Sequence, residues 1–168
     1  MRGSVDLRID LLVEQALRKK PHQSLVRAAR GFTELGGGPF ITAVTTSWAS
    51  ALLLHRRWRD AFRVTATIGL GSLARYLLHL IVARPRPSAP HIHVHGTAFP
   101  SGHTTAAALL FGTAAAEIHR PWAWAAAAVA VSSVGASRVI LRAHWLTDVI
   151  AGIAFAGGWM TAIRTLTR

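Results

Sequence analysis

Residues 99–118 read FPSGHTTAAALLFGTAAAEI, a short polar opening followed by an almost continuous run of Ala, Leu and Phe. Ala and Leu are strong helix formers, and a Ser ahead of an apolar run is typical of a helix N-cap. The stretch therefore predicts a helix that begins close to Ser101. A helix that is apolar on all sides must be surrounded by a protein core or by lipid.

Four further stretches of the chain have the same apolar character. Hydrophobic residues make up 51% of the 168 residues and charged residues only 15%, which is too apolar for an ordinary soluble domain of this size. We therefore predict an all-α integral membrane helical bundle with about five transmembrane helices, a multi-pass protein of the cell membrane. The expected spans are residues 39–54, 61–83, 104–118, 122–137 and 146–163.

The N-terminal residues have a different pattern. Apolar side chains recur at helical spacing on one face of residues 5–17, and acidic side chains such as Asp10 and Glu14 lie away from that face. This pattern is typical of a helix that lies in the membrane interface. We expect a single membrane-embedded domain over residues 1–168, with an amphipathic interfacial arm at 1–37 and a transmembrane catalytic core at 38–168.

The chain is strongly basic, with 19 Lys and Arg and a net charge of +12. Most of these residues stand at the edges of apolar segments or in short loops, where basic residues flank membrane spans, and not along one polar face with interleaved aromatics. We therefore expect membrane lipids as partners and no nucleic acid. Basic residues are balanced between the two sides of the membrane, so the positive-inside rule does not choose an orientation.

Three polar segments are expected to meet at one membrane surface. If consecutive spans alternate in direction, HLIVARPRP at 79–87, FPSGH at 99–103 and SRVILRAHWLTD at 137–148 all emerge on the same side. Each carries groups that a lipid-facing helix would not tolerate without a partner or a wet cavity. The sequence therefore predicts a shared polar pocket.

The predicted pocket is rich in fixed positive charge. An Arg guanidinium matches a phosphoryl group because its planar fork donates paired, charge-assisted hydrogen bonds. The start of the helix at Ser101 and Gly102 adds backbone N–H groups and a hydroxyl, reinforced by the helix dipole. The pocket therefore favours a phosphoryl guest, and its candidate cations are Arg84, Arg86, Arg138 and Arg142.

Two histidines are candidates for the chemistry. His144 and Asp148 are four residues apart, so on one helix they share a face, and the carboxylate can hold one ring nitrogen while the other faces the guest. Displacement at phosphorus requires the attacking and leaving atoms in line. We expect His144 to attack and His103, arriving from the neighbouring helix, to protonate the departing oxygen.

Together, the three segments resemble the three signatures of the type 2 phosphatidic acid phosphatase superfamily, K-x6-R-P, P-S-G-H and S-R-x5-H-x3-D. Every fixed letter matches except the first, where His79 stands in place of Lys. The resemblance covers residues 79–148 by motif and the remainder by helix arrangement. It implies a phosphatase in which His144 forms a phosphohistidine, Asp148 orients it and His103 protonates the leaving group.

The same resemblance assigns the phosphoryl oxygens to Arg86, Ser101, Gly102 and Arg138, with His79 at the position of the family's Lys. It implies no metal and no cofactor, and a phosphorylated lipid as substrate. Among relatives, polyprenyl-linked phosphates of cell-wall precursor metabolism suit a chain this short, such as decaprenylphosphoryl-5-phosphoribose or undecaprenyl diphosphate. The resemblance also favours an active site near the extracytoplasmic surface.

Several interpretations stay open at this point. Arg84 belongs either to the substrate site or to the surface, Arg142 is expected to reach a second part of the headgroup, and Arg75 is expected on the same face as His79. The alternating histidines of HIHVHG at 91–96 suit either a zinc site or a loop above an anion pocket. The alternative function is a non-catalytic membrane protein that binds or transports anionic lipid headgroups with the same basic pocket.

Overall fold

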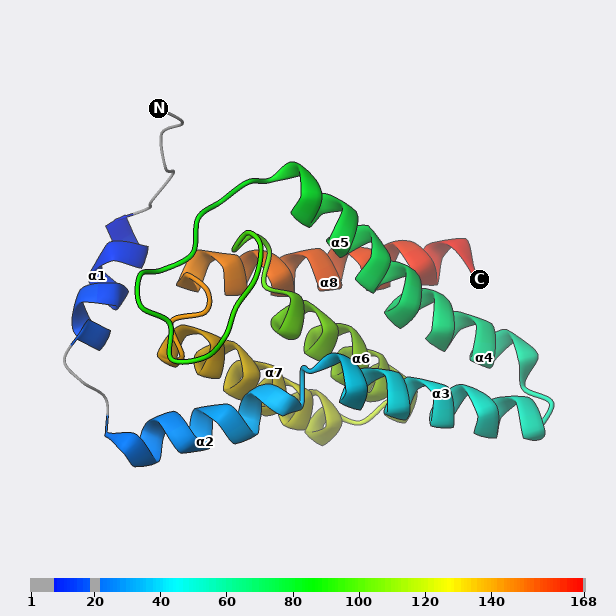
Figure 1. Ribbon diagram of the computed structural model, residues 1–168. Helices are drawn as coiled ribbons and strands as arrows, with labels where there is room; N and C mark the ends of the chain where they lie inside the picture. The colour runs from blue at the N-terminus through cyan, green and yellow to red at the C-terminus, as the bar shows by residue number, and fades with distance from the viewer. Residues whose placement is uncertain (1–7, 19–21, 168) are drawn as a thin grey trace.

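The computed structural model describes residues 8–18 and 22–167, and every regular element in those ranges is helical (Figure 1). The elements are α1 (Arg8–Arg18), α2 (Gln23–Glu34), α3 (Gly38–Leu54), α4 (Trp58–Thr65), the π-helical η1 (Ala66–Leu70), α5 (Gly71–Ile81), α6 (Gly102–Ile118), α7 (Pro121–Ile140) and α8 (Leu146–Leu166). All five predicted apolar segments are helices whose ends lie within a few residues of the expected positions. The second segment is one long helix in which α4, η1 and α5 are continuous.

Three helices within the described ranges are long and apolar enough to cross a membrane, namely Trp58–Ile81, Pro121–Ile140 and Leu146–Leu166. The helices α3 and α6 have 17 residues each, which is shorter than the ~20 residues of a full span. Membrane-spanning length is therefore established for three helices and not for the expected five.

The helix α6 lies at the centre of the bundle, packed against α7 and α8. Two glycines on these neighbours permit the close approach. A Cβ at Gly152 would stand 2.7 Å from the Thr105 hydroxyl, and one at Gly135 would stand 2.7 Å from Val149. Because such distances leave no room for a side chain, the contact at Gly152 fixes the register of α6 against α8, and the contact at Gly135 fixes the register of α7 against α8.

The N-terminal helices pack on the bundle, α1 against α8 and α2 against α7. On α1 the apolar residues Ile9 and Leu12 are 47% and 65% exposed, whereas Asp10 is 1% exposed and faces the protein. The helix therefore turns its acidic side inward and its apolar side outward, as expected for an interfacial helix. Residues 1–7 and 19–21 of the predicted arm lie outside the described residues.

Candidate active site

The three polar segments meet at one end of the bundle, as alternating helix directions predict (Figure 1). Backbone hydrogen bonds join them: the His91 N–H donates to the Leu141 carbonyl at 2.9 Å, and the Ser101 N–H donates to the Asp148 carbonyl at 3.1 Å. The connection 82–101, the start of α6 and the turn between α7 and α8 therefore form one framework.

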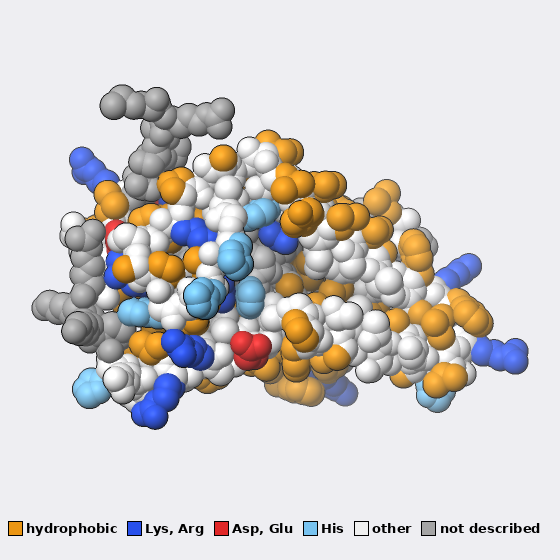
Figure 2. Space-filling view, in the orientation of Figure 1, with side chains coloured by type: hydrophobic (Ala, Val, Ile, Leu, Met, Phe, Trp, Pro, Cys, Tyr) orange, Lys and Arg blue, Asp and Glu red, His pale blue; other side chains and the backbone are white. Residues whose placement is uncertain are grey.

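This framework encloses a cavity of about 310 Å³, called the catalytic cavity below. Figure 2 shows basic and His side chains gathered over this end of the molecule, whereas hydrophobic side chains dominate the opposite part, with further basic side chains at its tip. Most of the residues that line the cavity are Arg or His. The predicted site residues that line the cavity are Arg75, His79, Arg86, Gly102, His103, Arg138 and His144.

His144 is 5% exposed and is one of the residues that line the cavity. Its Nδ1 lies 2.6 Å from the carbonyl oxygen of Ala98, which can only accept a hydrogen bond. Nδ1 therefore carries the proton and donates, and Nε2 of the neutral ring keeps a lone pair. That Nε2 lies 3.2 Å from Arg86 Nη1, a donor, at the wall of the catalytic cavity.

The relation between His144 and Asp148 differs from the expected pair on one helix. His144 stands in the turn before α8, because Arg142 adopts a left-handed conformation (φ 55°) and ends the α7 path. Nδ1 of His144 is 3.7 Å from Asp148 Oδ2, beyond hydrogen-bond distance. Asp148 instead accepts the Trp145 N–H at 2.9 Å, so its carboxylate holds the backbone that carries His144 and supplies a nearby negative charge.

Burial lowers the pKa of His144 below its ordinary value of 6.5, because the interior disfavours the charged imidazole. Asp148 opposes this shift, and the positive charges of Arg138 and Arg86 add to it. The ring is therefore neutral at neutral pH. A neutral imidazole with a lone pair on Nε2 has the form required of a nucleophile.

Two guanidinium groups flank His144. Arg86 donates to the carbonyls of Ala143 at 2.6 Å, His95 at 2.9 Å and Gly96 at 3.1 Å, which fixes its plane at the cavity wall. Arg138 is 4% exposed and donates to the Thr33 hydroxyl of α2 at 2.8 Å. These hydrogen-bond partners are neutral acceptors, and the positive charge of Arg138 and Arg86 is offset only in part, by the Glu34 and Asp148 carboxylates respectively.

The start of α6 contributes differently from what the sequence predicts. The Ser101 side chain is fully buried, bonds to the Thr104 hydroxyl at 2.9 Å and is not part of the cavity lining. Gly102 does line the cavity, and a Cβ there would stand 3.4 Å from the Arg75 guanidinium. The Arg75 guanidinium therefore lies in van der Waals reach of the helix N-terminus.

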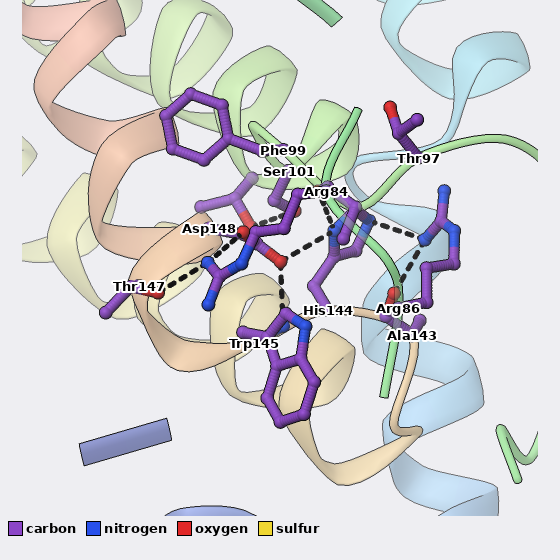
Figure 3. A network of polar contacts seen from close by, with 12 residues as sticks. Arg84, Arg86, Thr97, Phe99, Ser101, Ala143, His144, Trp145, Thr147 and Asp148 are labelled. Atoms are coloured by element: carbon purple, nitrogen blue, oxygen red, sulfur yellow. Dashed lines mark hydrogen bonds and ion pairs between the residues drawn. The ribbon is translucent and has the colours of Figure 1, made fainter. Parts of the chain in front are cut away.

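Arg84, a candidate for substrate binding, does not line the catalytic cavity and points toward Thr147 and Asp148 (Figure 3). It donates to Asp148 at 2.6 Å, to Asp10 of α1 at 2.6 Å and to the Thr147 hydroxyl at 2.7 Å. The guanidinium of Arg84 is therefore ion-paired with two buried carboxylates. Burial alone would raise the pKa of Asp10, but hydrogen bonds from Thr147 and Arg84 outweigh it and hold the pKa below its usual value of 3.8.

Arg142 also lies outside the catalytic cavity. It donates to Glu14 of α1 at 2.8 Å and to the Ser88 hydroxyl at 3.2 Å. The sequence places Arg142 one helical turn from Arg138, but the left-handed residue at the end of α7 directs the side chain to α1. The expected contact with a second part of the headgroup is therefore not supported by its position.

His79 and Arg75 both line the cavity, on one face of α5 as expected. The Thr97 hydroxyl is 3.0 Å from His79 Nδ1, and the Phe99 carbonyl is 3.3 Å from the same atom. Arg75 lies 5.8 Å from the centre of the Tyr76 ring and forms no ion pair with any residue in the described ranges. Arg75 is therefore an uncompensated cation beside Gly102.

The alternating histidines do not come together. Within residues 8–18 and 22–167, no three His, Asp or Glu side chains are grouped so that they could hold a metal ion. His93 and His95 line the catalytic cavity, and His91 lines a neighbouring one. These histidines therefore belong to the loop beside the two cavities.

Sequence reasoning missed four groups that hold the site. The Ala98 carbonyl has no sequence signal because any residue supplies one. Thr33, Asp10 and Glu14 lie in the N-terminal helices and reach the site only through tertiary contacts. A clue was available, since the chain has only 7 acidic residues against 19 basic ones, and two of them stand one helical turn apart on α1.

Comparison with known proteins identifies the family to which the chain is related. Residues 60–168 match the PAP2 superfamily. The chain is 32% identical to decaprenylphosphoryl-5-phosphoribose phosphatase of Mycobacterium tuberculosis over 164 residues, covering 91% of this chain and 84% of that protein. It is 28% identical to phosphatidylglycerophosphatase B of Bacillus subtilis over 134 residues (74% of this chain) and 33% identical to lipid A 1-phosphatase of Rhizobium etli over 135 residues (72% of this chain). These two matches span 66% and 55% of the relatives' own lengths.

Solved structures agree in fold. The PAP2-type transmembrane phosphatidylglycerolphosphate phosphatase of Bacillus subtilis superposes with a TM-score of 0.85 at 25% identity, covering 94% of this chain and 83% of that one. Aquifex aeolicus LpxE superposes with a TM-score of 0.81 at 18% identity, covering 97% and 99%. With the matching residues, the shared fold and a cavity that holds the motif histidines and arginines, the chain belongs to the PAP2 superfamily.

Proposed function

We propose that this protein is a membrane phosphatase that hydrolyses a phosphate group from a lipid-linked substrate through a phosphohistidine at His144, without a metal or cofactor. The observation that carries the proposal is the state of His144. Its Nδ1 is committed to the Ala98 carbonyl, and its Nε2 lies at a cavity wall that also carries Arg86, Arg138 and His103.

In the proposed reaction, Arg86, Arg138 and the backbone N–H groups at the start of α6 hold the non-bridging phosphoryl oxygens. His144 Nε2 attacks phosphorus in line with the bond to the leaving oxygen, and that bond breaks as His103 gives the oxygen a proton. Water then attacks the phosphohistidine, His103 takes the water proton, and inorganic phosphate and free His144 result. The Asp148 carboxylate stabilises the positive charge that develops on the imidazole.

The membrane setting supports a lipid substrate, since an apolar tail can remain in the bilayer while the phosphate reaches the cavity. A polyprenyl-linked phosphate of cell-wall precursor metabolism is the substrate we favour, supported by the similarity to a decaprenylphosphoryl-5-phosphoribose phosphatase along 91% of the chain. We further propose that α3 and α6 join the three longer helices in the membrane, with flanking residues completing their spans, and that the cavity faces the extracytoplasmic side.

The test is phosphate release from prenyl monophosphate by the detergent-solubilised protein, with and without a chelator. We expect chelator-independent release and a radiolabelled, acid-labile phosphoenzyme that is missing in His144→Ala. Absence of release from any lipid phosphate would favour a headgroup-binding protein. Phosphate release that stops when chelator is added would indicate that the reaction requires a metal ion. Radiolabel retained in His144→Ala would show that another residue is the nucleophile.

A further inference from the structure

The end of α2 and the turn that follows it, residues 33–37, are called the α2–α3 corner below. The corner precedes residues 60–168, the part of the chain that matches the PAP2 superfamily. Thr33, Gly36 and Gly37 are buried, and α2 packs along α7 (Figure 1). The corner therefore reaches the site from a part of the chain that the three motifs do not cover.

The first contact is made by the hydroxyl of Thr33. It accepts a hydrogen bond from Nη1 of Arg138 at 2.8 Å, across 105 positions of sequence. Arg138 is 4% exposed, and among the residues that the structure describes Thr33 is the one hydrogen-bond partner of its side chain. The Glu34 carboxylate, next along the corner, attracts the same cation. Since Arg138 lines the catalytic cavity, Thr33 sets the direction from which this guanidinium meets a phosphoryl oxygen.

The second contact is made by the backbone of Gly36. A Cβ at this position would stand 2.5 Å from the carbonyl oxygen and 3.0 Å from the carbonyl carbon of His103, and 2.9 Å from Val134 Cγ1. The φ of Gly36 lies outside the left-handed region, so lack of space, and not conformation, excludes a side chain here. Gly36 therefore fits between α6 and α7, directly against the backbone that carries the proposed general acid.

The backbone of the corner is itself held in place. The Gly36 N–H donates to the Thr33 carbonyl at 3.0 Å, and the Gly37 N–H donates to the Glu34 carbonyl at 2.9 Å. The Gly37 carbonyl accepts the Ile41 N–H at 3.0 Å, so α3 begins directly at the end of the corner. Because a close-packed segment of this kind yields little, it transmits its position to the groups that it contacts.

We infer that the α2–α3 corner is a positioning element of the active site, in which Thr33 orients Arg138 for phosphoryl binding and Gly36 sets the location of His103 for proton transfer. The inference rests on the proposed function for the roles of Arg138 and His103. Because the two contacts serve different parts of the reaction, changes at Thr33 and at Gly36 should have different kinetic effects.

Gly36→Ala tests the contact with His103. Relief of the overlap requires a shift of about 1 Å, and misplacement of this size lowers a catalytic rate about a hundredfold. We expect this loss of kcat/KM for prenyl monophosphate, whose alkoxide must be protonated, and little change for 4-nitrophenyl phosphate, whose phenolate leaves without a proton. Both substrates are given to one preparation of the detergent-solubilised full chain, so the ratio of the two kcat/KM values does not depend on how much protein is folded. A wild-type ratio would overturn the inference.

Gly31→Ala is the matched control on α2. Gly31 is exposed, and an added Cβ there would have no atom within 4 Å. The change should leave kcat/KM for both substrates at the wild-type value, because Ala is favoured over Gly inside a helix. If Gly31→Ala altered the ratio as much as Gly36→Ala does, the effect would not come from the contact with His103, and the inference would fail.

Thr33→Val and Thr33→Ser test the contact with Arg138. Val keeps the shape of the side chain and removes the hydroxyl, whereas Ser keeps the hydroxyl. Thr33→Val should bind tungstate, a mimic of phosphate, about tenfold more weakly and lose kcat/KM equally for both substrates, the effect of one hydrogen bond to a charged group, and Thr33→Ser should stay near the wild type. The affinity is measured by calorimetry and is a property of the folded molecules alone. Wild-type affinity in Thr33→Val would overturn the inference.

Failure of this inference and failure of the proposed function have different signatures. If the wild type hydrolyses both substrates and Gly36→Ala lowers kcat/KM for both in the same proportion, only the inference fails. If the wild type hydrolyses neither substrate, the proposed function fails, and tungstate binding still tests the contact of Thr33 with Arg138.

Discussion

Replacing Arg84 by Met tests whether this residue organises the site or binds substrate. The guanidinium is 10% exposed and lies between Asp10 and Asp148, which are both fully buried at their side chains. Removing it leaves two buried carboxylates without their cation. Breaking a buried ion pair in this way costs about 3–5 kcal/mol.

For a protein of this length, 1 kcal/mol shifts the thermal midpoint by about 2–4 °C, so Arg84→Met should unfold about 6–20 °C below the wild type in the same detergent. Turnover should fall as well, because Asp148 loses the partner that holds it. The double variant Asp10→Asn with Arg84→Met should recover part of the midpoint, since one uncompensated charge is removed. A wild-type midpoint combined with a raised KM alone would refute the structural role and restore Arg84 to the substrate site.

Other changes test the catalytic residues. His144→Ala should abolish phosphate release while tungstate, a phosphate analogue, still binds; substantial turnover would contradict the assignment. The acid limb of kcat/KM should have its midpoint below pH 6.5, because the neutral imidazole is active and burial lowers the pKa of His144; a midpoint above 6.5 would contradict this. Asp148→Asn should slow turnover at least tenfold, about 1.4 kcal/mol of barrier. Activity assays should show that His79→Lys retains turnover and that Arg75→Leu lowers kcat/KM more than Leu77→Ala, a change at an exposed residue; equal losses would exclude Arg75 from the site.

The helices were predictable because each apolar run is long and ends at a breaker. The run at 122–137 begins after Pro121, and the run at 39–54 follows three glycines. The meeting of His103, Arg86 and His144 was also predictable, since alternating directions return these segments to one end. The number of membrane spans was not predictable, because hydropathy does not say how many flanking residues continue each helix. The helices α3 and α6 end after 17 residues.

The internal organisation of the site could not be derived from spacing. An interval of four residues predicts a shared face only inside a helix, and His144 stands in a turn. Arg84 and Asp10 are 74 positions apart, and no periodic pattern links them. Ser101 matches its motif and stands at the N-cap of α6, yet its hydroxyl bonds to the Thr104 hydroxyl and not to a backbone N–H of the helix. The motif alone does not say which way this side chain points.

The close packing of α6 has a consequence for motion during turnover. With the backbone of Gly152 against Thr105 and that of Gly135 against Val149, α6 cannot slide along α8, and α8 cannot slide along α7, without severe overlap. The displacement needed to admit substrate and release product must therefore occur elsewhere. The connection 82–101 holds Arg86 and Ala98 against His144, so only its exposed part around residues 93–96 can move while the three helices remain a stationary frame.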